Sequence, residues 1–432
     1  MCTRLRYFCV EVVFINDRRH ENFDIRVRMY RQRILAICCI LFCITGWTTG
    51  SYYGEHHYEK NKAIDIDFGN LNLRNSKPAT PVSSLVTLLL KAGYNGETHS
   101  ITTEDGYILE VHRITGSKKE VNPVKNKPVF LIMHGLLASS PTWIFSSPEN
   151  SLAFILADAG YDVWLGNARG TIYSRNHVSL TVEDKDYWQF SWHEIGKYDL
   201  PAKIDYILKE TGREKLFYAG HSQGTTSFFV MASERPEYQN KVEAMFALAP
   251  VAYSGRMFSP VLRFLSRFTD TSVSLTGPIT MAKFAKLACD EDAVTQPLCT
   301  NFVFLICGYS HEQLNKVKVI KSRIFKKNVF YFIGKFRQFD YGAIGNMKRY
   351  RRITPPPYDL GSIKTPIYMF YSSNDWLAHV RDVHQTYQEL GNVIAKIRVP
   401  HETFNHIDFI WGIDARTLVY NKVLSFLSRH KE

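Results

Sequence analysis

The chain has 432 residues, enough to bury a large core and to hold more than one structural unit. With 45% hydrophobic and 22% charged residues, its composition is that of an ordinary globular protein. The net charge of +12 does not require a nucleic-acid partner, because part of it lies in residues 1–50 and no basic motif of a nucleic-acid-binding fold is present.

Residues 1–50 have the pattern of an n-region followed by a secretory signal peptide. Residues 34–47 are apolar except for Thr45 and Gly46, arginines precede them, and small or polar residues follow. Because the run is shorter than the roughly 20 residues of a membrane span, we predict secretion. The alternatives are a lysosomal location, or a membrane anchor if the signal is not cleaved. Met29 is an alternative start, since the stretch before the apolar run is long for an n-region.

Residues 51–80 are predicted to be an N-terminal extension, after which the folded part of the chain begins. Residues 83–92 have a helical pattern. Two alternating runs then flank Asp105 and Gly106, which is the pattern of a β-hairpin around an Asp-Gly turn. The two predicted hairpin strands are residues 98–103 and 107–113.

Residues 81–250 are predicted to form the first part of an α/β core. Continuous apolar runs, as in residues 129–133, are typical of strands that are buried on both faces. Helical segments alternate with these strands, which predicts a mostly parallel sheet with helices on both faces. The predicted strands are residues 129–133, 162–165, 215–219 and 242–249; the predicted helices are residues 151–159, 199–211, with Asp199 as N-cap and Pro201 in the first turn, and 225–234.

The alternation stops for residues 251–365 and resumes in residues 366–432, the second part of the core. An insertion of this length between two core strands predicts a mainly helical cap, or lid, over the active site. The resumed elements are predicted strands at 366–371 and 395–399, a helix from about residue 380, and a final helix from residue 416.

Gly220-His221-Ser222-Gln223-Gly224 has the G-x-S-x-G pattern of a nucleophile elbow. A short strand is predicted before it and a helix after it, so that a sharp turn exposes the Ser222 hydroxyl. Ser222 is therefore the candidate nucleophile, and the backbone N–H of Gln223 could donate to an oxyanion. The alternative interpretation is a glycine-rich loop that ends a strand.

A serine nucleophile needs a base, and the base needs a carboxylate to orient it. Asp375 and His406 follow the last two predicted strands. Their chain order Ser, acid, His is the order expected when the serine lies in a nucleophile elbow. Asp375 could instead only cap a turn. The rival acids are Asp382 and Asp408, of which Asp408 more plausibly packs or caps a helix; the rival bases are His379 and His401.

A second oxyanion donor is expected in the loop after the first core strand, which begins His134-Gly135-Leu136-Leu137. The glycine lets the backbone bend toward the serine, and the N–H of Leu136 is the candidate donor. A plain strand-to-helix turn would account for Gly135 but not for His134.

Several separated motifs together resemble the acid lipase family, the gastric and lysosomal lipases of the α/β-hydrolase fold. The resemblance covers about residues 81–430 and implies that Ser222, Asp375 and His406 form the triad, with Leu136 and Gln223 as oxyanion donors. The motifs are HGLL at 134–137, GYDVWLGN at 160–167, FSWHE at 190–194, KYDLPA at 197–202, GHSQGTT at 220–226, NDWLA at 374–378 and FNHIDF at 404–409.

Cysteine usage agrees with export, because only Cys289, Cys299 and Cys307 would remain after cleavage of the signal. One disulfide and one free thiol is the simplest account, and no zinc or other metal site is expected. The resemblance implies that Cys289 pairs with Cys299 and leaves Cys307 free.

Unlike the glycosylated gastric and lysosomal relatives, the chain has no Asn-x-Ser/Thr sequon, which favours plain secretion over a lysosomal route.

The sequence therefore predicts a secreted serine lipase that hydrolyses neutral lipid esters, triacylglycerol or cholesteryl ester, at a droplet or micelle surface. No cofactor is expected. The alternative is a catalytically silent lipid carrier on a lipase scaffold, although such carriers lose a member of the triad. An epoxide hydrolase or dehalogenase of the same fold would have aspartate at position 222.

Overall fold

The computed structural model of the chain describes residues 82–117, 126–260, 262–263, 306–310, 313 and 334–430. The predicted signal peptide and N-terminal extension, as well as Cys289 and Cys299, lie outside these residues. Of the helices in the described ranges, none has the length and apolar character that crossing a membrane requires.

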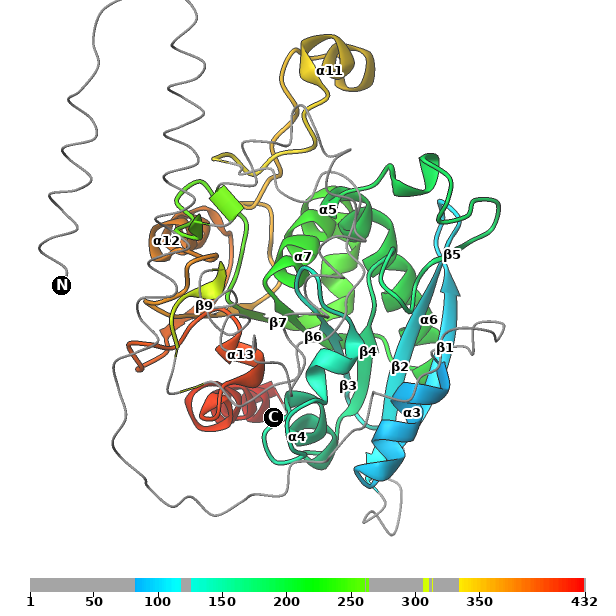
Figure 1. Cartoon of the computed structure of the whole chain (residues 1–432), viewed down its shortest axis with the longest axis vertical. Helices are drawn as coiled ribbons and strands as arrows, with labels where there is room; N and C mark the ends of the chain where they lie inside the picture. Colours follow the sequence, from blue (N-terminus) through cyan, green and yellow to red (C-terminus); the bar gives the residue numbers. More distant parts are fainter. Residues whose placement is uncertain are drawn as a thin grey trace, which may run out of the picture. The chain divides into compact units, whose positions relative to one another are not determined.

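Nine strands of the described chain form one sheet, in the order β1-β2-β4-β3-β6-β7-β8-β9, with β5 paired to β2 (Figure 1). The six strands from β4 to β9 along this order are parallel, and the N-terminal hairpin β1–β2 joins them antiparallel through β4. The strands are β1 (Tyr94–Thr102), β2 (Tyr107–Ser117), β3 (Val129–Met133), β4 (Asp162–Gly166), β5 (Asn176–His177), β6 (Leu216–His221), β7 (Val242–Leu248), β8 (Ile367–Tyr371) and β9 (Val393–Arg398).

The mostly parallel sheet confirms the predicted α/β class. The predicted hairpin around Asp105 and Gly106 is also found. Gly106 has φ +92°, the left-handed conformation that the tight turn requires and that glycine adopts without strain. The predicted strand at residues 129–133 is β3 itself, and every one of its side chains is buried. The hairpin strands are longer than predicted, because pairing extends beyond the alternating part of the sequence.

Helices connect and flank the strands, as Figure 1 shows for α4, α6 and α7. The α-helices are α3 (Val82–Lys91), α4 (Leu152–Asp158), α5 (Trp192–Glu194), α6 (Leu200–Thr211), α7 (Gln223–Glu234), α11 (Gly342–Tyr350), α12 (Val380–Glu389), α13 (Asp408–Trp411) and α14 (Asn421–Leu427). Shorter 3₁₀ segments are η1 (Ser140–Trp143), η2 (Asp186–Trp188), η4 (Pro236–Lys241) and η6 (Ser428–His430), and π-turns are η3 (Ile195–Asp199) and η5 (Arg416–Tyr420).

The prediction that Asp199 caps a helix is wrong. Asp199 has helical dihedral angles and makes no capping bond, because α5, η3 and α6 run on without a break. The N-cap is Ser191: its side chain accepts from the His193 N–H, and the Glu194 carboxylate accepts from the Ser191 N–H in return. The π-turn η3 ends at Asp199, two residues before Pro201. Pro201 has no N–H, which removes one helical hydrogen bond.

The carboxylate of Asp199 instead pairs with a fully buried arginine. Arg169 donates to Asp199 from its backbone N–H and its Nε at 2.9 and 2.7 Å, and to Asp105 from both terminal nitrogens at 2.6 and 2.9 Å. Its guanidinium lies 4.0 Å from the ring centre of Tyr107. The buried Lys203 is near the same cluster, with Nζ 3.4 Å from the Asp199 carbonyl oxygen. These contacts join the hairpin turn, the loop after β4 and the start of α6.

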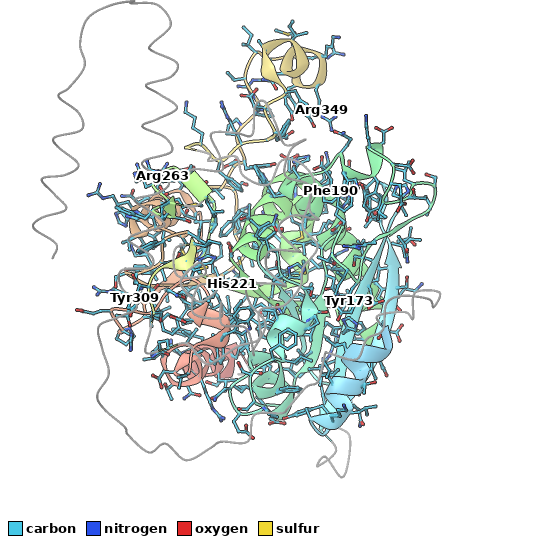
Figure 2. The ribbon with its side chains drawn as sticks, in the orientation of Figure 1. Tyr173, Phe190, His221, Arg263, Tyr309 and Arg349 are labelled. Atoms are coloured by element: carbon cyan, nitrogen blue, oxygen red, sulfur yellow. The ribbon has the colours of Figure 1, made fainter. Side chains whose placement is uncertain are left out.

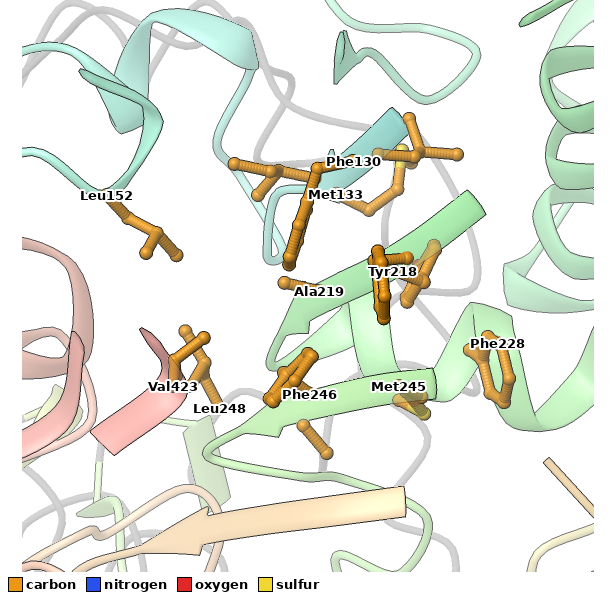
Figure 3. Packing of buried hydrophobic residues seen from close by; sticks show 14 of the residues in the cluster. Phe130, Met133, Leu152, Tyr218, Ala219, Phe228, Met245, Phe246, Leu248 and Val423 are labelled. Atoms are coloured by element: carbon orange, nitrogen blue, oxygen red, sulfur yellow. The ribbon is translucent and has the colours of Figure 1, made fainter. Parts of the chain in front are cut away.

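Aromatic side chains fill the core on the strands that lead to the candidate site. Phe130 on β3 stacks at 6.0 Å on Phe217 of β6 and at 6.0 Å on Phe246 of β7. Figure 3 shows Phe130, Tyr218 and Phe246 packed in this region. Because three adjacent strands share this packing, their carboxyl ends are held at fixed positions relative to one another.

The predicted insertion lies between β7 and β8 along the chain. Its described residues include α11 and a bridge between Arg337 and Pro357. They also include residues 306–310, which pack beside the segments that follow β8 and β9. That the insertion forms a mainly helical cap over the site stays a prediction.

Candidate active site

Ser222 lies at the turn between β6 and α7, where the sequence predicts the nucleophile elbow. Its φ of 52° and ψ of −116° form a conformation that non-glycine residues rarely adopt. The N–H of Ser222 donates to the carbonyl of Leu248 on β7, 3.0 Å away, which ties the turn to the neighbouring strand. The strained serine therefore stands between the end of a buried strand and the start of a helix.

The two glycines of the motif are needed for close backbone approach. A Cβ on Gly220 would lie 2.6 Å from the carbonyl carbon of Gly224, across the turn. A Cβ on Gly224 would lie 2.5 Å from the carbonyl oxygen of Met133, at the end of β3. Real Cβ atoms do not come this close to backbone, so a side chain at either position would push the turn open.

Asp375 and His406 form a direct, buried hydrogen bond. His406 Nδ1 donates to Asp375 Oδ2 at 2.7 Å, and the two residues are 3% and 2% exposed. The second carboxylate oxygen, Oδ1, accepts from the backbone N–H groups of Leu377 and Ala378 at 2.8 and 2.7 Å. These two bonds fix the carboxylate, and the carboxylate in turn fixes the imidazole with Nδ1 protonated and Nε2 available as a base.

His221 connects this pair to the elbow. Its Nε2 donates to the backbone carbonyl of His406 at 2.8 Å, and the two imidazole rings lie 4.8 Å apart. Burial and the neighbouring His406 lower the pKa of His221 well below its ordinary range, so the ring is neutral at physiological pH. His221 is labelled in Figure 2. The residue that follows it is Ser222, so this bond ties the elbow to the backbone of the candidate base.

No hydrogen bond joins the Ser222 hydroxyl to His406 within the part of the chain that the structure describes. Bonds of this kind are often long before substrate binds and tighten in the reactive complex. The structure thus brings the candidate acid and base into contact, and it joins the elbow to the candidate base through His221.

The loop after β3 approaches the serine through Gly135. A Cβ on Gly135 would lie 3.1 Å from the Cβ of Ser222 and 2.8 Å from His221 Nδ1. Among the described residues, no acceptor is found for the N–H of Leu136, the candidate oxyanion donor. The N–H of Gln223 is at the first position of α7, where helix N–H groups have no partner in the helix.

His134 holds this loop with both ring nitrogens. Nδ1 donates to the Gly135 carbonyl at 2.8 Å, and Nε2 accepts from the Ala168 N–H at 3.2 Å. Only a neutral ring with its proton on Nδ1 can make both bonds. Burial lowers the pKa of His134 from its ordinary 6.5 to about 4, which keeps the ring in this form at neutral pH.

The rival acids are occupied elsewhere. Asp382 accepts from the backbone N–H and Nη1 of Arg256, both at 2.8 Å. Asp408, the first residue of α13, accepts from the Asn405 N–H at 2.7 Å and the Ser310 hydroxyl at 2.5 Å. Burial raises the pKa of Asp408 to about 6.

Both rival bases have hydrogen-bond partners outside the pair that His406 forms with Asp375. His379 is the N-cap of α12 and accepts from the Arg381 N–H at 3.2 Å. His401 Nε2 lies 3.2 Å from the side-chain nitrogen of Gln313. The geometry therefore favours His406 as the base.

Sequence reasoning missed the contact of His221 and the hydrogen bonds of His134. His221 lies inside the G-x-S-x-G pattern, where only the serine and glycines are specified, and its partner is far away in the chain. The signal for His134 was present in the sequence, because a simple turn would not explain a histidine before Gly135.

The described residues contain no group of three or more histidine, cysteine, aspartate or glutamate side chains that could hold a metal ion. Cys307 is buried and not in a disulfide. Burial, with Asp375 and Asp408 nearby, raises the pKa of its thiol far above the ordinary range. The pairing of Cys289 with Cys299 lies outside the described residues.

Two family models match the chain. The family model described as "alpha/beta hydrolase fold" matches residues 128–412, and the model described as "Partial alpha/beta-hydrolase lipase region" matches residues 85–147. Together the two models cover most of the described chain, including the elbow and the segments after β8 and β9.

Three similar proteins have lipase names. The chain is 40% identical over 427 residues to Lipase 1 of Drosophila melanogaster, covering 94% of each chain. It is 37% identical to human gastric triacylglycerol lipase, covering 84% of this chain and 95% of the relative. It is 36% identical to human lysosomal acid lipase/cholesteryl ester hydrolase, covering 91% and 98%.

Proposed function

Because the chain belongs to the acid lipase family of the α/β-hydrolase fold and is a carboxylic ester hydrolase, we propose that it is a secreted lipase of neutral lipids. Its substrates are the esters that the names of its relatives indicate, triacylglycerols or cholesteryl esters. The observation that supports this proposal best is the buried hydrogen bond between His406 and Asp375, beside a serine in a strained elbow.

The reaction proceeds through an acyl-enzyme. Ser222 Oγ attacks the ester carbonyl carbon while His406 Nε2 takes the hydroxyl proton. Asp375 holds the imidazole and stabilises its positive charge. The His406 proton then passes to the leaving alcohol, and the ester C–O bond breaks. A water molecule, deprotonated by His406, releases the fatty acid from Ser222.

The charge that develops on the carbonyl oxygen is stabilised by backbone N–H groups. Those of Leu136 and Gln223 are the donors, one from the loop after β3 and one from the N-terminus of α7. The close approach of Gly135 to Ser222 supports this assignment, because it brings the Leu136 peptide near the elbow. The start of α7 adds the favourable end of a helix dipole.

The deciding experiment compares Ser222→Ala with Ser233→Ala, a serine near the end of α7, as a control. We expect Ser222→Ala to abolish hydrolysis of emulsified triacylglycerol and labelling by a fluorophosphonate, while Ser233→Ala retains both. A panel of triacylglycerol, cholesteryl ester and short-chain esters, assayed from acid to neutral pH, identifies the substrate. Full activity of Ser222→Ala would overturn the proposal, and lipid binding without labelling of the native protein would favour a silent carrier.

The proposed export is tested separately. The mature protein should begin after residue 47, and it should be recovered from the medium of expressing cells. N-terminal sequencing that starts before Ile34 would contradict the cleaved signal and favour the membrane-anchored alternative.

A further inference from the structure

Residues 307–310 of the insertion lie between the loop that holds Asp375 and the loop that holds His406. The carbonyl oxygen of Cys307 accepts from the N–H of Trp376 at 3.3 Å and from the N–H of His406 at 3.4 Å. Trp376 directly follows the candidate acid in the chain. One backbone oxygen of the insertion therefore contacts both candidate catalytic loops.

Two asparagine side chains extend this connection. Asn374, just before Asp375, donates to the carbonyl of Tyr309 at 2.6 Å, and Asn405, just before His406, donates to the carbonyl of Gly308 at 2.8 Å. Asn374 also donates to the Thr403 carbonyl at 2.8 Å, directly from one loop to the other. Tyr309 is labelled in Figure 2. The carbonyls of residues 307–309 thus accept hydrogen bonds from the loop that holds the acid and from the loop that holds the base.

Glycine is required at position 308. Its φ is +109°, a conformation that L side chains rarely adopt, and a Cβ there would lie 2.2 Å from the carbonyl oxygen of Asn374. Such a Cβ would also lie 3.2 Å from the Trp376 ring and 3.3 Å from the Asn405 Cβ. Any side chain would therefore separate the segment from both loops.

The start of the insertion contacts the same loop. The N–H groups of Phe258 and Ser259 donate to the carbonyl of Trp376 at 2.8 and 3.2 Å. The peptide groups on the two sides of Trp376 are thus bound by two separate segments of the insertion. The loop that contains Asp375 is held by backbone that lies outside the parallel strands of the core.

We propose that residues 307–310 are a positioning element that holds the Asp375 loop and the His406 loop together, with Gly308 as its essential residue. The proposal rests on the roles of Asp375 and His406 in the proposed function. Gly308 itself touches no substrate; it acts by keeping His406 Nδ1 at 2.7 Å from Asp375 Oδ2. In this proposal the insertion helps to set the relative positions of Asp375 and His406.

The test compares Gly308→Ala with Gly334→Ala, a substitution in the same insertion where a Cβ would meet nothing within 4 Å. Activity on a soluble ester is expressed per active site, counted with a phosphonate that releases nitrophenol, so that unfolded protein does not enter the rate. For Gly308→Ala we expect kcat to fall about 10- to 100-fold, because a displacement of about 1 Å at a catalytic group has effects of this size. Gly334→Ala should match the native protein.

The split between kcat and KM separates a positioning role from a merely structural one. Loosening the contact between His406 and Asp375 should lower kcat and leave KM for the soluble ester unchanged, because the two side chains act on the reacting atoms and do not bind the rest of the substrate.

Two results would overturn the proposal: an unchanged kcat per active site in Gly308→Ala, or a loss of activity that lies entirely in KM. If Gly308→Ala does not fold, Asn374→Ala decides, since it removes the bonds to Tyr309 and Thr403 without adding volume; we expect kcat to fall about three- to tenfold with KM unchanged. Failure of the proposed function is recognised separately, because only that failure leaves Ser222→Ala active.

Discussion

The Nδ1 atom of His134 donates a hydrogen bond to the carbonyl oxygen of Gly135, 2.8 Å away. In a planar trans peptide the C=O and N–H groups point in opposite directions, so this bond also fixes the direction of the Leu136 N–H. The bond from Ala168 to Nε2 fixes the ring itself. His134 therefore determines where the candidate oxyanion donor points.

Replacing His134 with alanine should lower kcat for ester hydrolysis about 10- to 100-fold, with a small effect on KM. The donor remains in the backbone, so the loss should be smaller than the roughly 10²- to 10³-fold loss of deleting a donor outright. His193→Ala is the control, because His193 is also buried and hydrogen-bonded, to Tyr358, but outside the site. Equal losses in both variants would show that only folding is affected.

Acid should destabilise the protein through His134. Its pKa is about 4 in the folded chain and 6.5 when unfolded, so the unfolded chain binds more protons between these values. The contribution of neutral His134 to the free energy of unfolding is fully present above pH 6.5. On the order of 3 kcal/mol of this free energy is lost as the pH falls to 4. Denaturant unfolding at several pH values should show a weaker dependence for His134→Gln. An identical pH dependence in the variant would contradict this assignment.

Asp375→Asn should reduce kcat about 10³- to 10⁴-fold without preventing folding. An amide can still accept from Leu377 and Ala378, but it does not stabilise the imidazolium and favours the wrong His406 tautomer. Asp382→Asn is the matched control, since that carboxylate pairs with Arg256 rather than with a histidine. Steady-state rates, with circular dichroism to check folding, measure the difference. Comparable losses in the two variants would reject Asp375 as the orienting acid.

Asp199→Ala should destabilise the fold by about 3–5 kcal/mol, because it leaves the buried charge of Arg169 without one of its two carboxylates. Burial already lowers the pKa of the neighbouring Lys203 to about 8, which shows how poorly charge is solvated there. Lys215→Gln, which breaks an exposed pair with Glu243, should change the unfolding free energy by less than about 1 kcal/mol. Urea unfolding measures both variants; a small effect of Asp199→Ala would mean that water reaches Arg169.

The sequence predicted the elements whose signal is local. The apolar run of β3 and the Asp-Gly turn depend on residues that are neighbours in the chain, and both are found where they were expected. The uninterrupted helix through Asp199 was missed, although the Ser191 to Glu194 capping box was visible. Pro201 suggested a helix start, and the π-turn that accommodates the proline has no simple sequence pattern.

The candidate site was predictable in its chemical groups but not in its supports. The order of Ser222, Asp375 and His406 follows the strands, so their residue types and positions sufficed to select them. The bond from His221 to His406 and those of Cys307 join residues far apart in the chain. Such contacts depend on how distant segments pack, and periodicity or spacing does not reveal them.

The position of the insertion also constrains the order in which the protein can fold. Strands β7 and β8 are adjacent in the sheet but separated by residues 249–366, and closing so long a loop is slow. Ser222 precedes this closure, whereas Asp375 and His406 follow it. A nascent chain that ends before β8 would therefore form the elbow without its base and expose the apolar edge of β7 to aggregation. Activity can emerge only after the ribosome has passed His406.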